Sequence, residues 1–166
     1  MKRYCLDTSG FSNPMETTPE DIHVSLWLLM KTMVESGCLA CTPEIYEELT
    51  RITGDIGVCL CENEHNLILD LDDAGWPVEE YIECVSRMQA VHESVIAEYN
   101  NDRKNTVGLN DISIIALAKT LNVPLISMES SAGNSTTKRR IPDICQLEGV
   151  VHFTFNDMLR REGHRI

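Results

Sequence analysis

The chain has 166 residues, of which 43% are hydrophobic, and its 26 acidic and 14 basic residues give a formal net charge of −12. This length and composition predict one globular domain over residues 1–166 with a sizeable core. The acidic balance excludes a protein that binds nucleic-acid phosphates over a broad basic surface, because non-specific affinity for nucleic acid comes mostly from Lys and Arg.

The cysteine pattern and the apolar runs indicate the cellular compartment of the protein. Seven cysteines without framework spacing favour reduced thiols that pack in a core. Cys38 and Cys41 form a C-x-x-C pair, for which we prefer core packing to a zinc site. The first residues provide no signal-peptide core, and no apolar run approaches the ~20 residues that span a bilayer. We therefore expect a soluble, cytoplasmic protein without a membrane partner.

The first half of the chain alternates between strand-like and helix-like patterns. In order, we expect a strand over 3–6, a turn-rich segment over 9–14, a helix that begins near 18–21 and ends at Gly37, a strand over 38–41, and a helix that Thr42 caps. Pro43 suits the first position of that last helix. Residues 54–71 follow neither period clearly, and we interpret them as helix with an irregular end.

The second half continues the alternation. We expect one long amphipathic helix over 78–101, a helix over 111–121, a buried strand over 123–127, a polar loop over 133–138, a short helical turn over 141–147, a strand over 150–154 and a closing helix over 155–161. Strands that alternate with helices predict an α/β fold, a three-layer α/β/α sandwich with a central parallel sheet.

Four acids stand at positions that such a fold turns toward one point. They are Asp7, Glu48, Asp111 and Glu129. Asp7 and Glu129 directly follow predicted strands, whose carboxyl ends form the ligand crevice of a parallel sheet. Carboxylates that converge raise one another's pKa unless a cation lies among them. Because Mg²⁺ and Mn²⁺ prefer oxygen ligands and are bound together with substrate phosphates, the pattern favours a metal-dependent nuclease.

The motifs around these acids resemble those of PIN-domain ribonucleases, in the same order and over nearly the whole chain. Asp7-Thr8-Ser9 resembles their D-T-N or D-T-S opening, and Glu48-Leu49 resembles their helix glutamate followed by leucine. Residues 110–118 resemble their D-x-x-I-A-x-A helix, and 125–129 resemble their strand that ends in a hydroxyl residue, one residue and an acid. The chain departs from the pattern in Glu129, where many members have Asp, and in the long segment 54–76.

The resemblance implies a PIN-like fold and a VapC-like toxin or a related uncharacterised PIN-like branch. Its members are Mg²⁺-dependent RNA endonucleases, often homodimers, and a cognate antitoxin protein inhibits them. The order Glu-Leu also favours Glu48 over its neighbour Glu47 as the site residue. The alternative is a non-catalytic PIN-like module that binds a metal or a protein.

Phosphodiester hydrolysis gives each candidate a role. Asp7, Asp111 and Glu129 would hold one or two Mg²⁺ or Mn²⁺ ions, and Glu48 would complete the shell or orient the attacking water. The hydroxyls of Thr8, Ser9 and Ser127 would bind a carboxylate or phosphate oxygen, or else cap turns after strands. The run Lys138-Arg139-Arg140 would contact RNA phosphates, or else form a solvated loop.

Asp143 is a reserve metal ligand or, because Pro142 precedes it, a helix cap. The aromatic residues are too scattered along the chain to predict a platform on which RNA bases stack, and core packing accounts for them.

Overall fold

The computed structural model describes residues 1–70, 72–73 and 75–164. In this part of the chain a four-stranded sheet has the order β2-β1-β3-β4, with every pair parallel. The strands are β1 (Tyr4–Leu6), β2 (Leu39–Ala40), β3 (Leu125–Ile126) and β4 (His152–Phe153). Cys5 is in register with Ala40 on one side and Leu125 on the other. β1 and β3 are therefore neighbours, and their carboxyl ends lie at the same edge.

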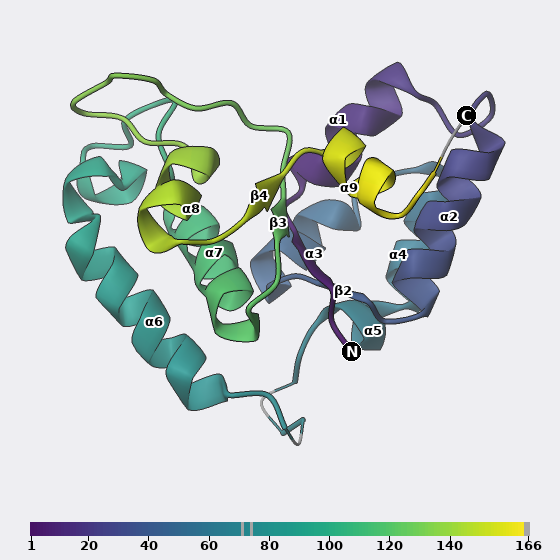
Figure 1. The fold of residues 1–166 in the computed structure, drawn as a ribbon, viewed down its shortest axis with the longest axis horizontal. Coiled ribbons are helices and arrows are strands. Elements are labelled where there is room, and N and C mark those ends of the chain that lie inside the picture. Colours follow the sequence, from purple (N-terminus) through teal and green to yellow (C-terminus); the bar gives the residue numbers. More distant parts are fainter. Residues whose placement is uncertain (71, 74, 165–166) are drawn as a thin grey trace.

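Helices cover both faces of the sheet, so the predicted three-layer α/β/α sandwich is confirmed. They are α1 (Ser9–Thr17), α2 (Val24–Glu35), α3 (Pro43–Leu49), α4 (Gly54–Glu62), α5 (Glu64–Leu67), α6 (Val78–Val91), α7 (Leu109–Leu121), α8 (Ile141–Glu148) and α9 (Phe155–Arg161), with 3₁₀ turns η1 (Glu93–Val95) and η2 (Ala97–Tyr99). Figure 1 shows α6, α7 and α8 to one side of the strands and α2, α4, α5 and α9 to the other. None of these helices combines the length and apolarity that crossing a bilayer requires.

Local sequence signals account for several element boundaries. Thr42 caps α3 as predicted, since its hydroxyl accepts a hydrogen bond from the Ile45 N–H at 3.4 Å and Pro43 stands at the first helical position. Gly37 has φ +68°, a conformation that suits glycine, and follows the end of α2. The closing helix over 155–161 is confirmed with its predicted bounds.

The segment after Asp7 differs from the prediction. Residues 9–14 belong to helix α1 rather than to a turn, although Pro14 lies inside it. Gly10 makes this possible, because a Cβ atom there would lie 2.9 Å from the Ile126 carbonyl oxygen. The helix thus starts pressed against β3. α2 begins only at Val24, and Ile22, which falls inside the expected helix, precedes it and is 70% exposed.

The segments between α3 and α8 also differ in part. The region 54–71 contains α4 and α5, and Ile68 forms an isolated parallel bridge with Cys41. The long helix expected over 78–101 ends at Val91 and continues as η1 and η2. α7 begins two residues earlier than predicted, with Gly108 as its N-cap residue, and the turn expected at 141–147 is a full helix.

The core lies between the sheet and the two helical layers. Trp27 of α2 is fully buried and stacks on Phe155 with ring centroids 6.0 Å apart. The predicted core packing holds for five of the seven cysteines, since Cys61 is exposed and Cys84 half-buried, and the buried free thiols are Cys5, Cys38, Cys41, Cys59 and Cys145. Burial raises the pKa of Cys41 to about 12, so this thiol stays protonated.

An ion-pair network around one buried carboxylate, the Glu148 cluster, joins α6, α7 and α8. It consists of Glu148 with Arg87, His92 and Lys119, whose nitrogens lie 2.6, 2.7 and 2.8 Å from its carboxylate oxygens. The Glu148 side chain is only 5% exposed. Although burial opposes ionisation, the hydrogen bonds from the three partners lower the pKa of Glu148 to about 2.

Candidate functional site

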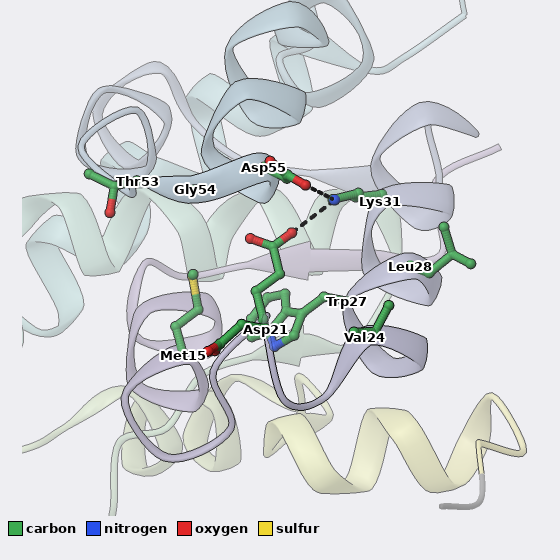
Figure 2. A pocket seen from close by; sticks show the side chains of 10 residues that line it. Met15, Asp21, Val24, Trp27, Leu28, Lys31, Thr53, Gly54 and Asp55 are labelled. Atoms are coloured by element: carbon green, nitrogen blue, oxygen red, sulfur yellow. Dashed lines mark hydrogen bonds and ion pairs between the residues drawn. The ribbon is translucent and has the colours of Figure 1, made fainter.

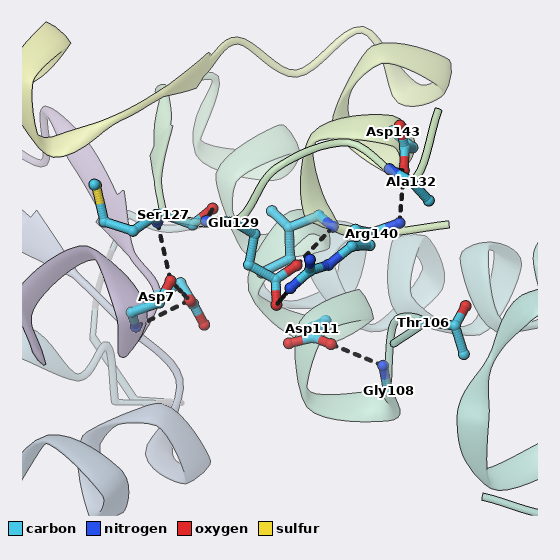
Figure 3. A network of polar contacts seen from close by, with 12 residues as sticks. Asp7, Thr106, Gly108, Asp111, Ser127, Glu129, Ala132, Arg140 and Asp143 are labelled. Carbon is cyan, nitrogen blue, oxygen red and sulfur yellow. Dashed lines mark hydrogen bonds and ion pairs between the residues drawn. The ribbon is translucent and has the colours of Figure 1, made fainter. Parts of the chain in front are cut away.

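Four carboxylates from four elements lie at the carboxyl edge of the sheet, and we call them the acid cluster. Asp7 follows β1, Glu48 lies in α3, Asp111 in the first turn of α7, and Glu129 follows β3. Figure 3 shows Asp7, Asp111 and Glu129 turned toward a common space from three different directions. The fold therefore brings together residues that are up to 122 positions apart, from 7 to 129.

Asp7 is held at the end of β1 by the serine that follows it. It is 6% exposed, and its Oδ2 accepts hydrogen bonds from the Ser9 hydroxyl at 2.5 Å and the Ser9 N–H at 3.1 Å. The same hydroxyl accepts a bond from the Met128 N–H at 3.0 Å, so Ser9 also ties the ends of β1 and β3 together. Burial raises the pKa of Asp7 against the Ser9 hydrogen bonds, and the charges of Glu129 and Glu48 raise it further.

Thr8 directs Glu48 toward the cluster. The Thr8 hydroxyl donates to Glu48 Oε2 at 2.6 Å, and the Glu48 side chain is partly buried. Glu47 is exposed, because adjacent residues on a helix point about 100° apart. Of the two candidates, Glu48 is the one beside Asp7. Its Oε2 is engaged by Thr8, and its charge acts on Asp7.

Asp111 combines a structural role with an unusual charge environment. Its Oδ2 accepts a hydrogen bond from the Gly108 N–H at 2.8 Å, which closes the first turn of α7. Burial nevertheless raises the pKa of Asp111 to about 7, and the charges of Asp7, Glu129 and Glu98 contribute to this increase. This carboxyl therefore keeps its proton to a higher pH than an ordinary Asp does.

Glu98 is an acid near the site that the sequence did not reveal. It lies in η2, and both of its carboxylate oxygens accept from the Leu109 N–H at 3.1 Å. It therefore stands at the N-terminus of α7, close enough to Asp111 to raise its pKa. No local motif marks it, because the apolar spacing around it predicts the continuation of α6.

Glu129 lies at the N-terminus of α8. Its Oε2 accepts from the Ile141 N–H at 3.2 Å, and its Oε1 is 3.6 Å from an Arg140 guanidinium nitrogen. Its side chain is 26% exposed. Glu129 is thus partly compensated by the helix terminus and by Arg140, whereas Asp7 and Asp111 have no ion pair within the described residues.

Ser127 lies behind the site rather than in it. Its side chain is fully buried, and its hydroxyl is 2.7 Å from His152 Nε2. Burial lowers the pKa of His152, so the imidazole is neutral. The Glu129 N–H lies 3.4 Å from the Ser127 hydroxyl. These contacts favour a role in positioning Glu129 over the direct substrate contact expected from the sequence.

The basic run 138–140 is more engaged with the protein than expected. Arg139 donates to the Ser135 and Lys138 carbonyls, and Arg140 pairs with Glu129. For the Lys138 ammonium group, no hydrogen bond or ion pair with the described residues is found. Lys138 is consequently the member of the run with its charge most available to a phosphate.

Asp143 acts as a helix cap, which was the alternative to a metal ligand. Its oxygens accept from the Ser131 hydroxyl, from the Ala132 N–H at 2.9 Å and from the Arg140 N–H at 2.7 Å. Burial opposes ionisation, but these hydrogen bonds lower the pKa of Asp143 overall. Figure 3 shows this carboxylate beyond Arg140, away from Asp7.

The acid cluster is not a preformed metal cage. Among residues 1–70, 72–73 and 75–164, no group of three or more His, Cys, Asp or Glu side chains is drawn together tightly enough to hold a metal ion. The carboxylates of Asp7, Asp111 and Glu129 are therefore not close enough together to bind one ion directly. The donor set still fits a hard divalent cation, because Mg²⁺ binds through one or two carboxylates and keeps several waters. Two buried carboxylates with raised pKa provide that set.

A separate cavity contains acidic residues that form ion pairs with a lysine. It has a volume of about 520 Å³ and lies between α2 and the start of α4 (Figure 2). There Lys31 pairs with Glu20 at 2.8 Å and with Asp55 at 3.5 Å. None of the four cluster acids lines it. Glu20 and Asp55 already share the Lys31 cation, so this cavity is a weaker candidate for metal chemistry.

Comparison with models of protein families identifies the family of this chain. The model of a domain of unknown function, DUF4411, matches residues 4–166. The chain belongs to the DUF4411 family. None of the curated proteins compared with the chain matches it. Because the description of the DUF4411 family states no activity, the resemblance to PIN-domain ribonucleases remains a prediction, and the case for function depends on the site.

Proposed function

We propose that this DUF4411 protein is a Mg²⁺- or Mn²⁺-dependent endoribonuclease that hydrolyses RNA phosphodiester bonds. The observation that supports this function best is the acid cluster, in which two buried carboxylates, Asp7 and Asp111, lack a cationic partner within the described residues. A folded protein that keeps such mutual repulsion benefits from a bound cation. The oxygen-only donor set favours a hard one.

The residues of the acid cluster would have different roles in in-line hydrolysis. Asp7, Asp111 and Glu129 would hold the ion, directly or through water. When bound, such an ion supplies charge stabilisation on the phosphate and a lowered pKa of a coordinated water. Glu48, oriented by the Thr8 hydroxyl at 2.6 Å, would orient the attacking water with its other carboxylate oxygen. Water attacks phosphorus as the bond to the leaving oxygen breaks.

The choice of RNA, the toxin role and the partners follow from the resemblance alone. We propose RNA as substrate, a cognate antitoxin as the inhibitor and a homodimer as the assembly. Co-purification with a protein encoded beside the gene tests the antitoxin, and light scattering tests the dimer. Lys138 would contact a phosphate of the substrate, while Arg140 would balance part of the charge of Glu129.

The adjacent glutamates of α3 provide a matched test. We expect labelled RNA to be cleaved with Mn²⁺ or Mg²⁺ and not with EDTA, and Glu48→Gln to lower the rate by about 100-fold or more. Glu47→Gln should change it little, since Glu47 is exposed. Melting temperatures of both variants control for folding. Cleavage that persists in EDTA, or equal loss in both variants, contradicts the proposal. Tight Mn²⁺ binding without any cleavage supports the non-catalytic module instead.

A further inference from the structure

A second cavity, with a volume of about 330 Å³, lies beside the first turn of α3, where α6 and α7 approach it. Its walls include the rings of Trp76 and Tyr81 and the aliphatic side chains of Ile68 and Leu117. Trp76 precedes α6 and Tyr81 lies in its first turn, so the fold assembles an aromatic surface that the spacing in the sequence did not predict.

The two aromatic rings form a defined pair. Their centroids are 5.6 Å apart and their planes are tilted by 46°. The Trp76 indole N–H donates to the Asp70 carbonyl at 2.7 Å, which fixes the orientation of the ring. This hydrogen bond is made at the edge of the ring and not at its faces. Burial raises the pKa of Tyr81, so its phenol is neutral and its ring keeps the negative π face. Both residues are half-buried.

The charged side chains that line the cavity are both acidic. Glu44 and Asp70 line it and are exposed, and the described lining residues include no Lys, Arg or His. Between His65 and Arg87 the sequence contains no basic residue at all. It contains the acids Asp70, Asp72, Asp73, Glu79, Glu80 and Glu83. A phosphate or carboxylate ligand would be repelled here, whereas a cation gains from both carboxylates.

We propose that this cavity binds an organic cation, an alkylammonium or guanidinium group, between the aromatic pair and the carboxylates of Glu44 and Asp70. Aromatic faces attract such groups through their quadrupole, and the attraction grows when the cation is desolvated. The aliphatic walls suit the methylene stem that carries the charge. The proposal does not require the nuclease activity. Glu44 lies one helical turn before Glu48 in α3, but none of the four cluster acids lines this cavity.

Tryptophan fluorescence provides a direct probe, because Trp27 is fully buried and Trp76 is half-buried. We expect butylguanidinium and tetramethylammonium to change the emission saturably at constant ionic strength, with Kd on the order of 1 mM. Calorimetry should give the same affinities. Butyrate and adenosine serve as anionic and neutral aromatic probes. Failure of the cations to saturate, or saturation by adenosine alone, overturns the proposal.

Surface variants locate the site. The pair Glu44→Gln and Asp70→Asn should weaken cation binding about tenfold or more, while Glu79→Gln, an exposed acid of the same segment that does not line the cavity, should not. Equal binding by the parent and the double variant contradicts the assignment. A capped Gly-Arg-Gly peptide distinguishes the sources: tighter binding than butylguanidinium indicates a side chain of a protein partner, and equal or weaker binding indicates a free small cation.

Discussion

Buried carboxylates occur in two regions of this protein with opposite consequences. In the Glu148 cluster, one carboxylate is surrounded by Arg87, His92 and Lys119, and its pKa falls to about 2. In the acid cluster, burial raises the pKa of Asp111 to about 7, and the charges of the surrounding acids add to this increase. Both regions bury a negative charge. The first region supplies positive charge to its buried carboxylate, which makes burial favourable, whereas in the acid cluster Arg140 pairs with Glu129 and no ion pair with Asp7 or Asp111 is found among the described residues.

The comparison separates a structural ion-pair network from a candidate site. Arg87 of α6, His92 just after it and Lys119 of α7 pair with Glu148 of α8, so the Glu148 cluster links three helices. The acid cluster retains repulsion that folding alone does not require, and a ligand cation would relieve it. Strongly perturbed carboxyl groups at the carboxyl edge of a parallel sheet are more typical of function than of packing.

Asp111→Asn gives the largest expected effect. The substitution removes a carboxylate but keeps an oxygen for the Gly108 N–H, so cleavage should fall by about 100-fold or more while the fold persists. The metal-free variant should also be more stable than the parent at pH 8, by up to about 4 kcal/mol. Urea unfolding in EDTA and cleavage assays with Mn²⁺ measure the two effects.

The pH dependence of the metal-free parent has a defined sign. Because the pKa of Asp111 is raised, the folded protein binds a proton that the unfolded chain releases, and stability should fall as pH rises from about 4 to about 7. Asp111→Asn should flatten this decrease. A parent whose stability increases over this interval, or a variant with the same slope as the parent, contradicts the proposed charge environment.

Glu148→Gln should have the opposite effect on stability to Asp111→Asn. It removes the anion that three basic groups share, so we expect a loss of about 3 kcal/mol in the free energy of unfolding at pH 7 and unchanged cleavage. Since the pKa of Glu148 is lowered, its contribution is present above about pH 4.5 and is lost as pH falls toward 2. The variant and the parent should therefore converge in acid.

An exposed acid of α6 provides the control for this change. Glu83→Gln should alter stability by no more than about 0.5 kcal/mol. A Glu148→Gln variant that is as stable as Glu83→Gln would show that the cluster contributes nothing, and reduced cleavage would show that it is coupled to the site.

The sequence predicted those structural features of the acid cluster that depend on a local pattern of residues. A buried apolar run that ends at Asp7 and another that ends shortly before Glu129 predicted parallel strands with acids at one edge, and β1 and β3 are parallel neighbours in the structure. The hydroxyl of Thr42 before Pro43 predicted the start of α3. These features depend on neighbours in the chain, so they can be recognised without a fold.

Features that depend on distant contacts were not predicted. Helix α1 looked like a turn because Gly10 and Pro14 break helices in isolation, whereas Gly10 is needed for the close approach to Ile126. Glu98 reaches α7 only because the chain bends after Val91, where apolar periodicity continues. The partners of Glu148 are 29 to 61 residues away from it in sequence.

Lys138 gives the smallest expected effect and tests how RNA approaches an acidic protein. Arg139 and Arg140 are engaged with carbonyls and with Glu129, so Lys138→Ala should lower the slope of log affinity against log salt by about 1 and weaken binding alike for all RNA sequences. Arg160→Ala, which removes an exposed cation of α9, is the control and should leave the slope unchanged. The measurement is RNA binding over a salt series in Ca²⁺ or with Glu48→Gln, where cleavage is suppressed. An unchanged slope in Lys138→Ala would mean that the loop is merely solvated and that the phosphates meet the protein only at the acid cluster.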